Sequence, residues 1–324
     1  MSLPRLLTLC FCLGLAFPVH PTIAASKKPG EPPPGSASTS SASTAVPASK
    51  KKSPESPGEA RKVTPAKVET EGSGAPRIHA ASAIVVDAQT GKVLHAVNPD
   101  EERAVASTQK LMTALLVCEA GGLDKTVTIQ KSDTWAEPSK LDVEPGEVYR
   151  KVDLLRILMV KSMNDVARAL ARDTAGSVEA FAERMNARAR ELGMKNSHFV
   201  NPNGLPAPGQ HSTARDMSKL AMAAYKLKAI REAVRLKELR WQNPSGQVTV
   251  YHNTNRVLSS LVHCNGMKTG YTVAAGFCLI SSGSFDGRDV ISVVLGDSKE
   301  FVWKDSHNLL VWALGVNPTV SSAP

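Results

Sequence analysis

A serine and a lysine three residues apart, Ser107 and Lys110, stand at the start of an apolar run that extends to Ala120. Apolar residues at three- and four-residue spacings in this run predict a helix, which Gly121 and Gly122 would end. Residues three apart on a helix project from the same face, so the amine can come within hydrogen-bond reach of the hydroxyl. A hydroxyl needs an adjacent base to act as a nucleophile, and a buried lysine can lose its proton and serve as that base. The pattern therefore indicates a Ser/Lys nucleophilic enzyme.

The Ser/Lys spacing is weak support when it stands alone. A helix cap followed by a solvated lysine would show the same letters. Ser49 and Lys52 repeat the spacing within a segment that is too polar to fold. The hypothesis therefore needs partners elsewhere in the chain.

A second pair of polar residues, Ser162 and Asn164, lies where one expected helix ends and the next begins. A short loop there can direct both side chains into a cleft. The Ser162 hydroxyl could relay a proton to a leaving amine. Asn164 could hold the lysine in place or donate to a substrate carbonyl. The alternative is a capping serine beside a surface asparagine, and Ser306 and Asn308 show the same spacing.

A third motif, Lys268-Thr269-Gly270, occurs once and lies in a strand-like run. A lysine and a hydroxyl beside an exposed sheet edge can hold a substrate carboxylate. Gly270 would let another backbone approach closely, and an extended peptide could dock along the edge. The backbone N–H groups of Tyr271 and Ser107 could form an oxyanion hole. Taken alone, the motif is better explained as a strand lysine and a turn glycine.

The expected order of strands and helices around these residues predicts one mixed α/β domain. Strands at both ends of the folded part would join in one sheet, and the helical middle would cover it. A β-hairpin is expected from 81–87 and 92–97, and further strands or extended segments at 126–129, 241–251, 266–271, 276–281 and 289–295. Helices are expected at 148–160, 163–175, 177–192, 217–227 and 301–314.

Together the three motifs occur in the order Ser-x-x-Lys, Ser-x-Asn, Lys-Thr-Gly. This order is typical of penicillin-binding proteins and class A β-lactamases, where the middle motif is Ser-Asp-Asn. From about Ile78 to Leu314 the chain resembles the serine-type D-Ala-D-Ala carboxypeptidases, the low-molecular-mass penicillin-binding proteins. Further stretches that resemble this family are 83–87, 90–94, 106–113, 181–186, 192–194, 212–216, 266–272 and 275–276.

The resemblance implies a single catalytic domain with the transpeptidase/β-lactamase-like α/β/α sandwich and a mixed, mainly antiparallel sheet. It implies that Ser107 attacks the peptide bond between the two terminal D-alanines of a peptidoglycan pentapeptide stem. Lys110 would be the base and Ser162 the relay, while Asn164 would contact the substrate and the lysine. Such an enzyme trims stem peptides and so limits cross-linking.

The resemblance also implies that Lys268 and Thr269 face the terminal carboxylate, with Gly270 and Tyr271 completing the substrate-binding strand. β-Lactams would act as covalent inhibitors, because they mimic the D-Ala-D-Ala amide and would acylate Ser107. No metal and no organic cofactor is implied.

Two residues depart from the family pattern. Met163 stands where a small residue is usual, so its side chain could narrow the cleft or point away from it. Gln109 stands where threonine is common. Many relatives carry a second β-rich domain and an amphipathic membrane anchor, whereas this sequence stops at Pro324 shortly after the closing helix. It thereby resembles the anchorless members, some of which are DD-endopeptidases.

Three alternative functions stay open. A DD-endopeptidase would use the same chemistry on a cross-bridge. A β-lactamase is disfavoured because deacylation needs a positioned carboxylate, and 196–204 contains no Asp or Glu. A wall-binding module without catalysis is disfavoured because all the polar groups of the motifs are present.

The first 76 residues predict export followed by a spacer. Residues 1–25 show a short basic start, an apolar stretch of about a dozen residues and small residues at the end, as in a secretory signal peptide. Residues 26–76, rich in Ser, Pro and Lys, predict a disordered tether. The catalytic domain is expected at 77–318 and a short tail at 319–324.

Charge and apolar content predict where the protein acts. The net charge is +9. Nucleic acid is a poor explanation for that charge in an exported protein, whereas contact of the tether with an anionic envelope fits. No transmembrane segment is expected after signal cleavage, so the protein would be secreted across the cytoplasmic membrane into the periplasm or cell wall.

Five cysteines are present, and Cys10 and Cys12 would leave with the signal peptide. The other three show no metal-ligand spacing. Cys118 is expected to be a buried small hydrophobe. A bridge between Cys264 and Cys278 is left open.

Overall fold

The computed structural model describes residues 68–70 and 74–316. The described residues all lie within one compact unit, Lys62–Pro324. The signal peptide and tail therefore fall outside the described residues, as does most of the tether. A short strand, β1 (Val68–Thr70), pairs with β3 (Val93–Val97) inside the segment expected to be tether. Sheet pairing thus begins before residue 76.

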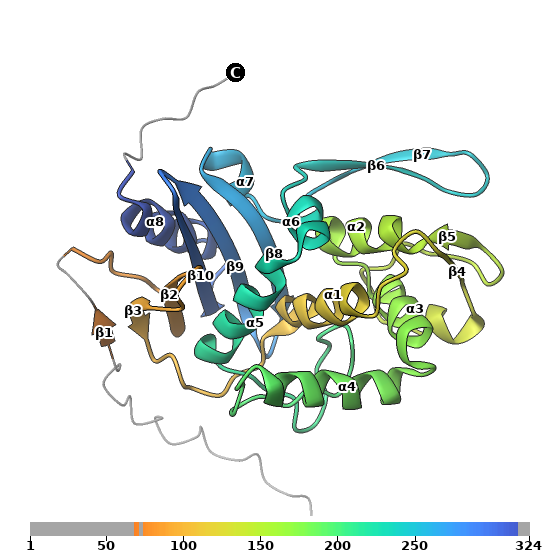
Figure 1. The fold of residues 1–324 in the computed structure, drawn as a ribbon, viewed down its shortest axis with the longest axis horizontal. Coiled ribbons are helices and arrows are strands. Elements are labelled where there is room, and N and C mark those ends of the chain that lie inside the picture. Colours follow the sequence, from red (N-terminus) through yellow and green to blue (C-terminus); the bar gives the residue numbers. More distant parts are fainter. Residues whose placement is uncertain (1–67, 71–73, 317–324) are drawn as a thin grey trace, which may run out of the picture. The chain divides into compact units, whose positions relative to one another are not determined.

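Six strands in the described part form one sheet, in the order β1-β3-β2-β10-β9-β8 (Figure 1). All neighbouring strands are antiparallel. The remaining strands of the sheet are β2 (Ser82–Asp87), β8 (Cys264–Thr272), β9 (Gly276–Phe285) and β10 (Arg288–Asp297). The N-terminal hairpin therefore pairs directly with the C-terminal strands, as the sequence predicted.

Side chains alternate across the sheet and build a core on each face. In β2, Ala83 and Val85 face one core, whereas Ile84 and Val86 face the other, because successive strand residues point to opposite faces. Helices α7 (Val257–Ser260) and α8 (Val302–Leu314) contribute to the first core. The other helices cover the opposite face: α1 (Lys110–Glu119), α2 (Lys151–Lys161), α3 (Asn164–Ala175), α4 (Val178–Glu191), α5 (Ala214–Lys226) and α6 (Lys228–Val234). This arrangement is the expected α/β/α sandwich.

The helix predicted at 148–160 begins three residues late. Val148–Arg150 form strand β5, which pairs with β4 (Thr126–Thr128). Tyr149 is buried while its two neighbours are exposed. This two-residue alternation is the pattern of a strand rather than of a helix.

Side-chain caps mark the starts of α4 and α5, and α5 begins three residues before the helix expected at 217–227. The Ser177 hydroxyl accepts the backbone N–H of Ala180 at 3.0 Å. The Thr213 hydroxyl accepts that of Asp216 at 3.1 Å. These bonds satisfy N–H groups that the first helical turn leaves without partners.

The predicted extended segment 241–251 is a hairpin of β6 (Glu238–Gln242) and β7 (Val248–His252). The short helices α6 and α7 were not predicted. Within the described part of the chain, no helix is long and apolar enough to span a membrane.

The cysteines of the described residues are free thiols. In the sheet, Cys264 lies opposite Gly283 and Cys278 lies opposite Gly270. The two cysteines are therefore about five positions apart along the strands, which is roughly 16 Å at the usual rise per residue. A disulfide requires Cα atoms within about 7 Å, so the bridge left open above does not form here. Cys118 is only partly buried, against the larger core.

Candidate active site

A cleft of about 300 Å³ gathers the three motifs. All predicted site residues except Lys110 and Lys268 line it, and those two lie buried beneath its surface. The lining residues that the sequence had singled out are Ser107, Ser162, Asn164, Thr269, Gly270 and Tyr271.

Ser107 lies in a 3₁₀ turn, η1 (Ala106–Gln109), that leads directly into α1. In a 3₁₀ turn side chains three apart eclipse one another, so Lys110 extends alongside Ser107. The Lys110 Nζ lies 2.8 Å from the Ser107 Oγ. The hydroxyl is partly exposed to the cleft, whereas Lys110 is completely buried.

The Lys110 amine has two further partners. Its Nζ lies 2.7 Å from the Asn164 Oδ1 and 2.6 Å from the Asn203 carbonyl oxygen. Burial lowers the pKa of Lys110 well below its usual value, and the nearby Lys268 charge lowers it further, while Asp165 opposes both. The amine therefore holds its proton much more weakly than a lysine in water.

The loop 201–204, which its sequence predicts to be rich in turns, supplies one of these partners. Gln109 donates through Nε2 to the Asn201 carbonyl at 2.6 Å. The Asn201 Oδ1 accepts the Gly204 N–H at 2.8 Å within the loop. One bond from the turn that precedes α1 and one internal bond thus fix the loop that presents the Asn203 carbonyl to Lys110. Gln109, a departure from the family pattern, thus anchors the loop. The turn-rich letters Asn-Pro-Asn-Gly indicated a tight turn but not its partner.

Ser162 ends α2 in the left-handed conformation, with φ 71° and ψ 32°. This conformation is costly for a residue other than glycine and is typical of functional sites. The Ser162 Oγ is buried and has no hydrogen-bond partner among the described residues. Met163, which follows, is buried in the core and does not line the cleft. Its bulk therefore does not narrow the site.

The wall opposite the sheet is held by the first two residues of α3. The Asn164 Nδ2 donates to the Pro138 carbonyl at 2.8 Å. The buried Asp165 carboxylate accepts the N–H groups of Leu141 and Asp142, each at 2.9 Å. Asp165 was missed by the sequence analysis, although an acidic residue in the first turn of a helix is a usual stabilising feature.

Strand β8 forms the other wall. A Cβ placed on Gly270 would lie 2.9 Å from the backbone nitrogens of Ser107 and Thr108. The predicted close approach of another backbone at this glycine is therefore present. The Tyr271 side chain is exposed, and its ring centroid lies 4.4 Å from that of Phe277. The oxyanion hole stays a prediction.

The two polar residues of the third motif differ in access to the cleft. Thr269 lines it, and its hydroxyl is 2.7 Å from the Thr254 hydroxyl. Lys268 is 1% exposed, and its Nζ donates to the Thr269 carbonyl at 3.0 Å. Contact of Lys268 with a substrate carboxylate stays a prediction.

The buried Lys268 makes stability depend on pH. Burial lowers its pKa to about 7, whereas the unfolded chain keeps this proton to about pH 10. Between these values the unfolded state binds more protons, so the free energy of unfolding rises with pH, by about 1 kcal/mol per pH unit from this group. Lys268→Met is expected to flatten the rise, as measured by urea unfolding at several pH values. The exposed Lys195→Met should keep the parent slope, and an unchanged slope in Lys268→Met would contradict the prediction.

Residues 69–299 match a family model described as D-alanyl-D-alanine carboxypeptidase. The chain is 36% identical over 261 residues to D-alanyl-D-alanine carboxypeptidase DacC of Escherichia coli, covering 76% of this chain and 64% of that protein. It is 33% identical over 246 residues to the D-alanyl-D-alanine endopeptidase of E. coli, covering 73% and 78%.

A solved structure shows the same fold. The D-alanyl-D-alanine carboxypeptidase DacD of Francisella tularensis superposes with a TM-score of 0.71 at 30% identity, covering 76% of this chain and 73% of that one. The chain spans about three fifths of the length of the curated carboxypeptidase relatives, with 58%, 64% and 63% of three of them covered.

Proposed function

The chain belongs to the D-alanyl-D-alanine carboxypeptidase family, and on this premise we propose that it removes the terminal D-alanine from peptidoglycan pentapeptide stems. The reaction proceeds through an acyl-enzyme at Ser107. The observation that carries the proposal is the fully buried Lys110 amine, 2.8 Å from the Ser107 hydroxyl. A lysine that releases its proton at this position is the base that the hydroxyl needs.

The hydrogen bonds around Lys110 support the neutral amine. A neutral amine has two N–H donors and one lone pair. The two carbonyl oxygens, from Asn164 and Asn203, match the two donors. The lone pair is then left for the Ser107 hydroxyl proton, so the network orients the base toward the nucleophile.

Acylation and deacylation follow from this arrangement. Lys110 takes the Ser107 proton as Oγ bonds to the carbonyl carbon of the penultimate D-alanine. The C–N bond then breaks, and the leaving amine receives a proton through Ser162, whose free hydroxyl supports the relay role. Water subsequently attacks the ester, which releases the shortened stem and restores the Ser107 hydroxyl.

The walls of the cleft would hold the substrate. Thr269, with Lys268 behind it, faces the terminal carboxylate. The N–H groups of Ser107 and Tyr271 stabilise the negative oxygen of the intermediate. Asn164 contacts the stem amide as well as the lysine. The peptide lies extended along β8.

Cleavage of cross-links is the second candidate function. The same Ser107 chemistry would serve it, and the chain covers 78% of the E. coli endopeptidase compared with 64% of the DacC carboxypeptidase. β-Lactamase activity is disfavoured, because the loop beside Lys110 supplies a main-chain carbonyl and residues 196–204 include no carboxylate.

The test uses the purified protein with two substrates and one inhibitor. Free D-alanine released from a pentapeptide supports the carboxypeptidase, whereas conversion of cross-linked dimers to monomers identifies the endopeptidase. Mass spectrometry after penicillin treatment should show one long-lived adduct on the peptide that contains Ser107. Rapid penicillin turnover would indicate a β-lactamase. Absence of both the adduct and product, with binding to cell wall, would indicate a non-catalytic wall protein.

The proposed setting is the bacterial envelope. The apolar stretch within residues 1–25 supports secretion across the cytoplasmic membrane to the periplasm or cell wall. A tether over residues 26–76, with its lysines toward an anionic surface, would precede the catalytic domain at 77–318 and the tail at 319–324.

A further inference from the structure

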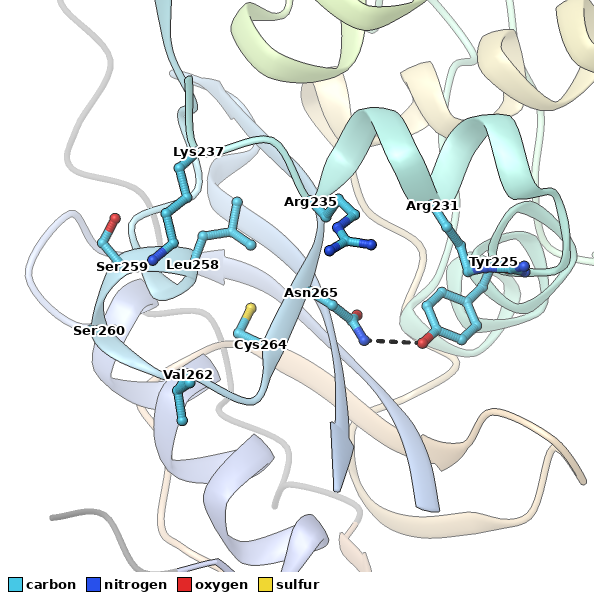
Figure 2. Close-up of a pocket in the computed structure, with 10 residues that line it drawn as sticks. All are labelled: Tyr225, Arg231, Arg235, Lys237, Leu258, Ser259, Ser260, Val262, Cys264 and Asn265. Atoms are coloured by element: carbon cyan, nitrogen blue, oxygen red, sulfur yellow. Dashed lines mark hydrogen bonds between the residues drawn. The ribbon is translucent and has the colours of Figure 1, made fainter. Parts of the chain in front are cut away.

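A second pocket, larger than the catalytic cleft, lies at the other end of β8. Its volume is about 420 Å³, within the usual range of roughly 300–1,000 Å³ for small-molecule sites. Figure 2 shows its lining, which comes from the end of α5, from α6 and the segment after it, from α7, and from the start of β8. The lining residues are Tyr225, Arg231, Arg235, Lys237, Leu258, Ser259, Ser260, Val262, Cys264 and Asn265.

Three of these residues carry positive charge. Arg231 is half-buried and positioned: its Nη1 donates to the Tyr225 carbonyl at 2.5 Å, and its guanidinium lies 5.7 Å from the centroid of the Tyr225 ring. Arg235 and Lys237 are exposed, and within the described residues neither side chain has a hydrogen bond or an ion pair. Two cationic groups are thus left without acidic partners in a concave site.

No acidic residue lines the pocket, and the acids nearby are engaged elsewhere. Glu232 pairs with Lys228 at 3.5 Å, and the Glu238 carboxylate lies 3.7 Å from the His252 ring at a different pocket. Asp289 lies behind Tyr225 and accepts its hydroxyl at 3.2 Å. The lining therefore has a charge of +3 with no neutralising carboxylate of its own.

The opposite wall offers neutral donors beside an apolar surface. The Asn265 Oδ1 accepts the Ser282 hydroxyl at 2.5 Å, and its amide nitrogen donates to the Tyr225 hydroxyl at 3.1 Å (Figure 2) and to the Ser284 hydroxyl at 2.9 Å. These bonds fix the Asn265 side chain in the wall and use both of its N–H donors. The exposed hydroxyls of Ser259 and Ser260 are the neutral donors that a ligand could reach, and the exposed Val262 adds an apolar surface. Such a lining suits a ligand with an anionic head and a small organic body.

We propose that this pocket binds a phosphoester, with the phosphate contacted by the exposed Arg235 and Lys237 and the organic body toward the exposed Val262. Arginine presents a planar fork of donors that matches phosphate oxygens in pairs. Three cationic groups also exceed what a single carboxylate would neutralise. The site is separate from the catalytic one, because Asn265 precedes Lys268 by three residues on β8, or about 10 Å.

The test measures binding by isothermal calorimetry and by vesicle sedimentation, with the full purified protein. The probes are glycerol 3-phosphate, glycerate as its carboxylate counterpart, and vesicles of phosphatidylglycerol or of phosphatidylcholine. The pocket variant is Arg235→Gln with Lys237→Gln. The control is Lys195→Gln with Lys299→Gln, two exposed lysines outside the pocket, which removes the same charge. Thermal unfolding verifies that each variant folds.

We expect the pocket variant to weaken binding of the phosphate probe about tenfold or more, and the control to change it little. Saturable binding of glycerol 3-phosphate identifies a soluble phosphoester, whereas binding to phosphatidylglycerol vesicles alone identifies a lipid headgroup. Equal binding of glycerate and glycerol 3-phosphate would overturn the proposal, as would equal losses in both variants or no binding to any phosphate probe. None of these readouts depends on catalysis, so the result is independent of the proposed peptidase activity.

Discussion

Replacement of Lys110 by arginine is expected to slow the acylation of Ser107 by penicillin about a thousandfold, although the positive charge is kept. The physical reason is that an arginine guanidinium does not lose its proton in proteins. Lys110→Met, which fits the buried site without a charge, should be as slow because it has no base. Ser107→Ala lacks the nucleophile and gives the background signal of the assay. The rate of adduct formation, followed by mass spectrometry, measures the effect.

A buried lysine away from the cleft provides the matched control. Lys151 is 8% exposed, and its amine lies 2.6 Å from the Asp173 carboxylate. An arginine can keep this ion pair, so Lys151→Arg should acylate at the parent rate. Parent-like acylation in Lys110→Met would show that another group activates Ser107, and urea unfolding distinguishes loss of the base from loss of the fold.

Gly204→Ala is expected to destabilise the protein by about 3 kcal/mol or more and to abolish acylation. Gly204 has φ +82°, and a Cβ there would lie 2.1 Å from the Ala106 carbonyl oxygen. Either the loop or the turn that carries Ser107 must therefore move. Movement of the loop would also withdraw the Asn203 carbonyl from Lys110.

Gly209→Ala is the control that separates the steric clash at Gly204 from the cost of placing alanine at a positive φ. Gly209 has a similar φ of +78°, but the nearest atom to its Cβ would be 3.9 Å away. Only the left-handed conformation is penalised there, so the expected loss is about 1 kcal/mol with acylation retained. Urea unfolding and the acylation rate measure both variants. If both substitutions lowered stability and the acylation rate equally, the clash with Ala106 in η1 would not be the cause of the effect of Gly204→Ala.

The side chains of the proposed catalytic site could be predicted from the sequence because the chemistry proposed for them depends on residue type. The spacing of Ser107 and Lys110 predicted the 2.8 Å contact, and the loop position of Asn164 predicted its reach to the lysine. The carbonyl of Asn203 could not be predicted in the same way. Every residue has a main-chain carbonyl, so no letter in the sequence marks the one that faces the amine.

Local patterns failed where distant segments decide the conformation. Residues Val148–Arg150 have apolar neighbours at helical spacing, yet pairing with β4 makes them a strand. The basic pocket was also not predicted, because Arg231, Arg235 and Asn265 converge from α6, the segment after it and β8. The fold class was predictable because it needs only the order of strands and helices.

The central pairing of β2 with β10 joins segments about two hundred positions apart, with Val86 opposite Ile291. Such long-range pairing slows folding, and during synthesis β2 has no neighbour on that side until the ribosome has made the last strand. The strand that walls the catalytic cleft, β8, also emerges late. A nascent chain therefore can complete neither the central sheet nor the β8 wall of the cleft until nearly all of the described part has left the ribosome.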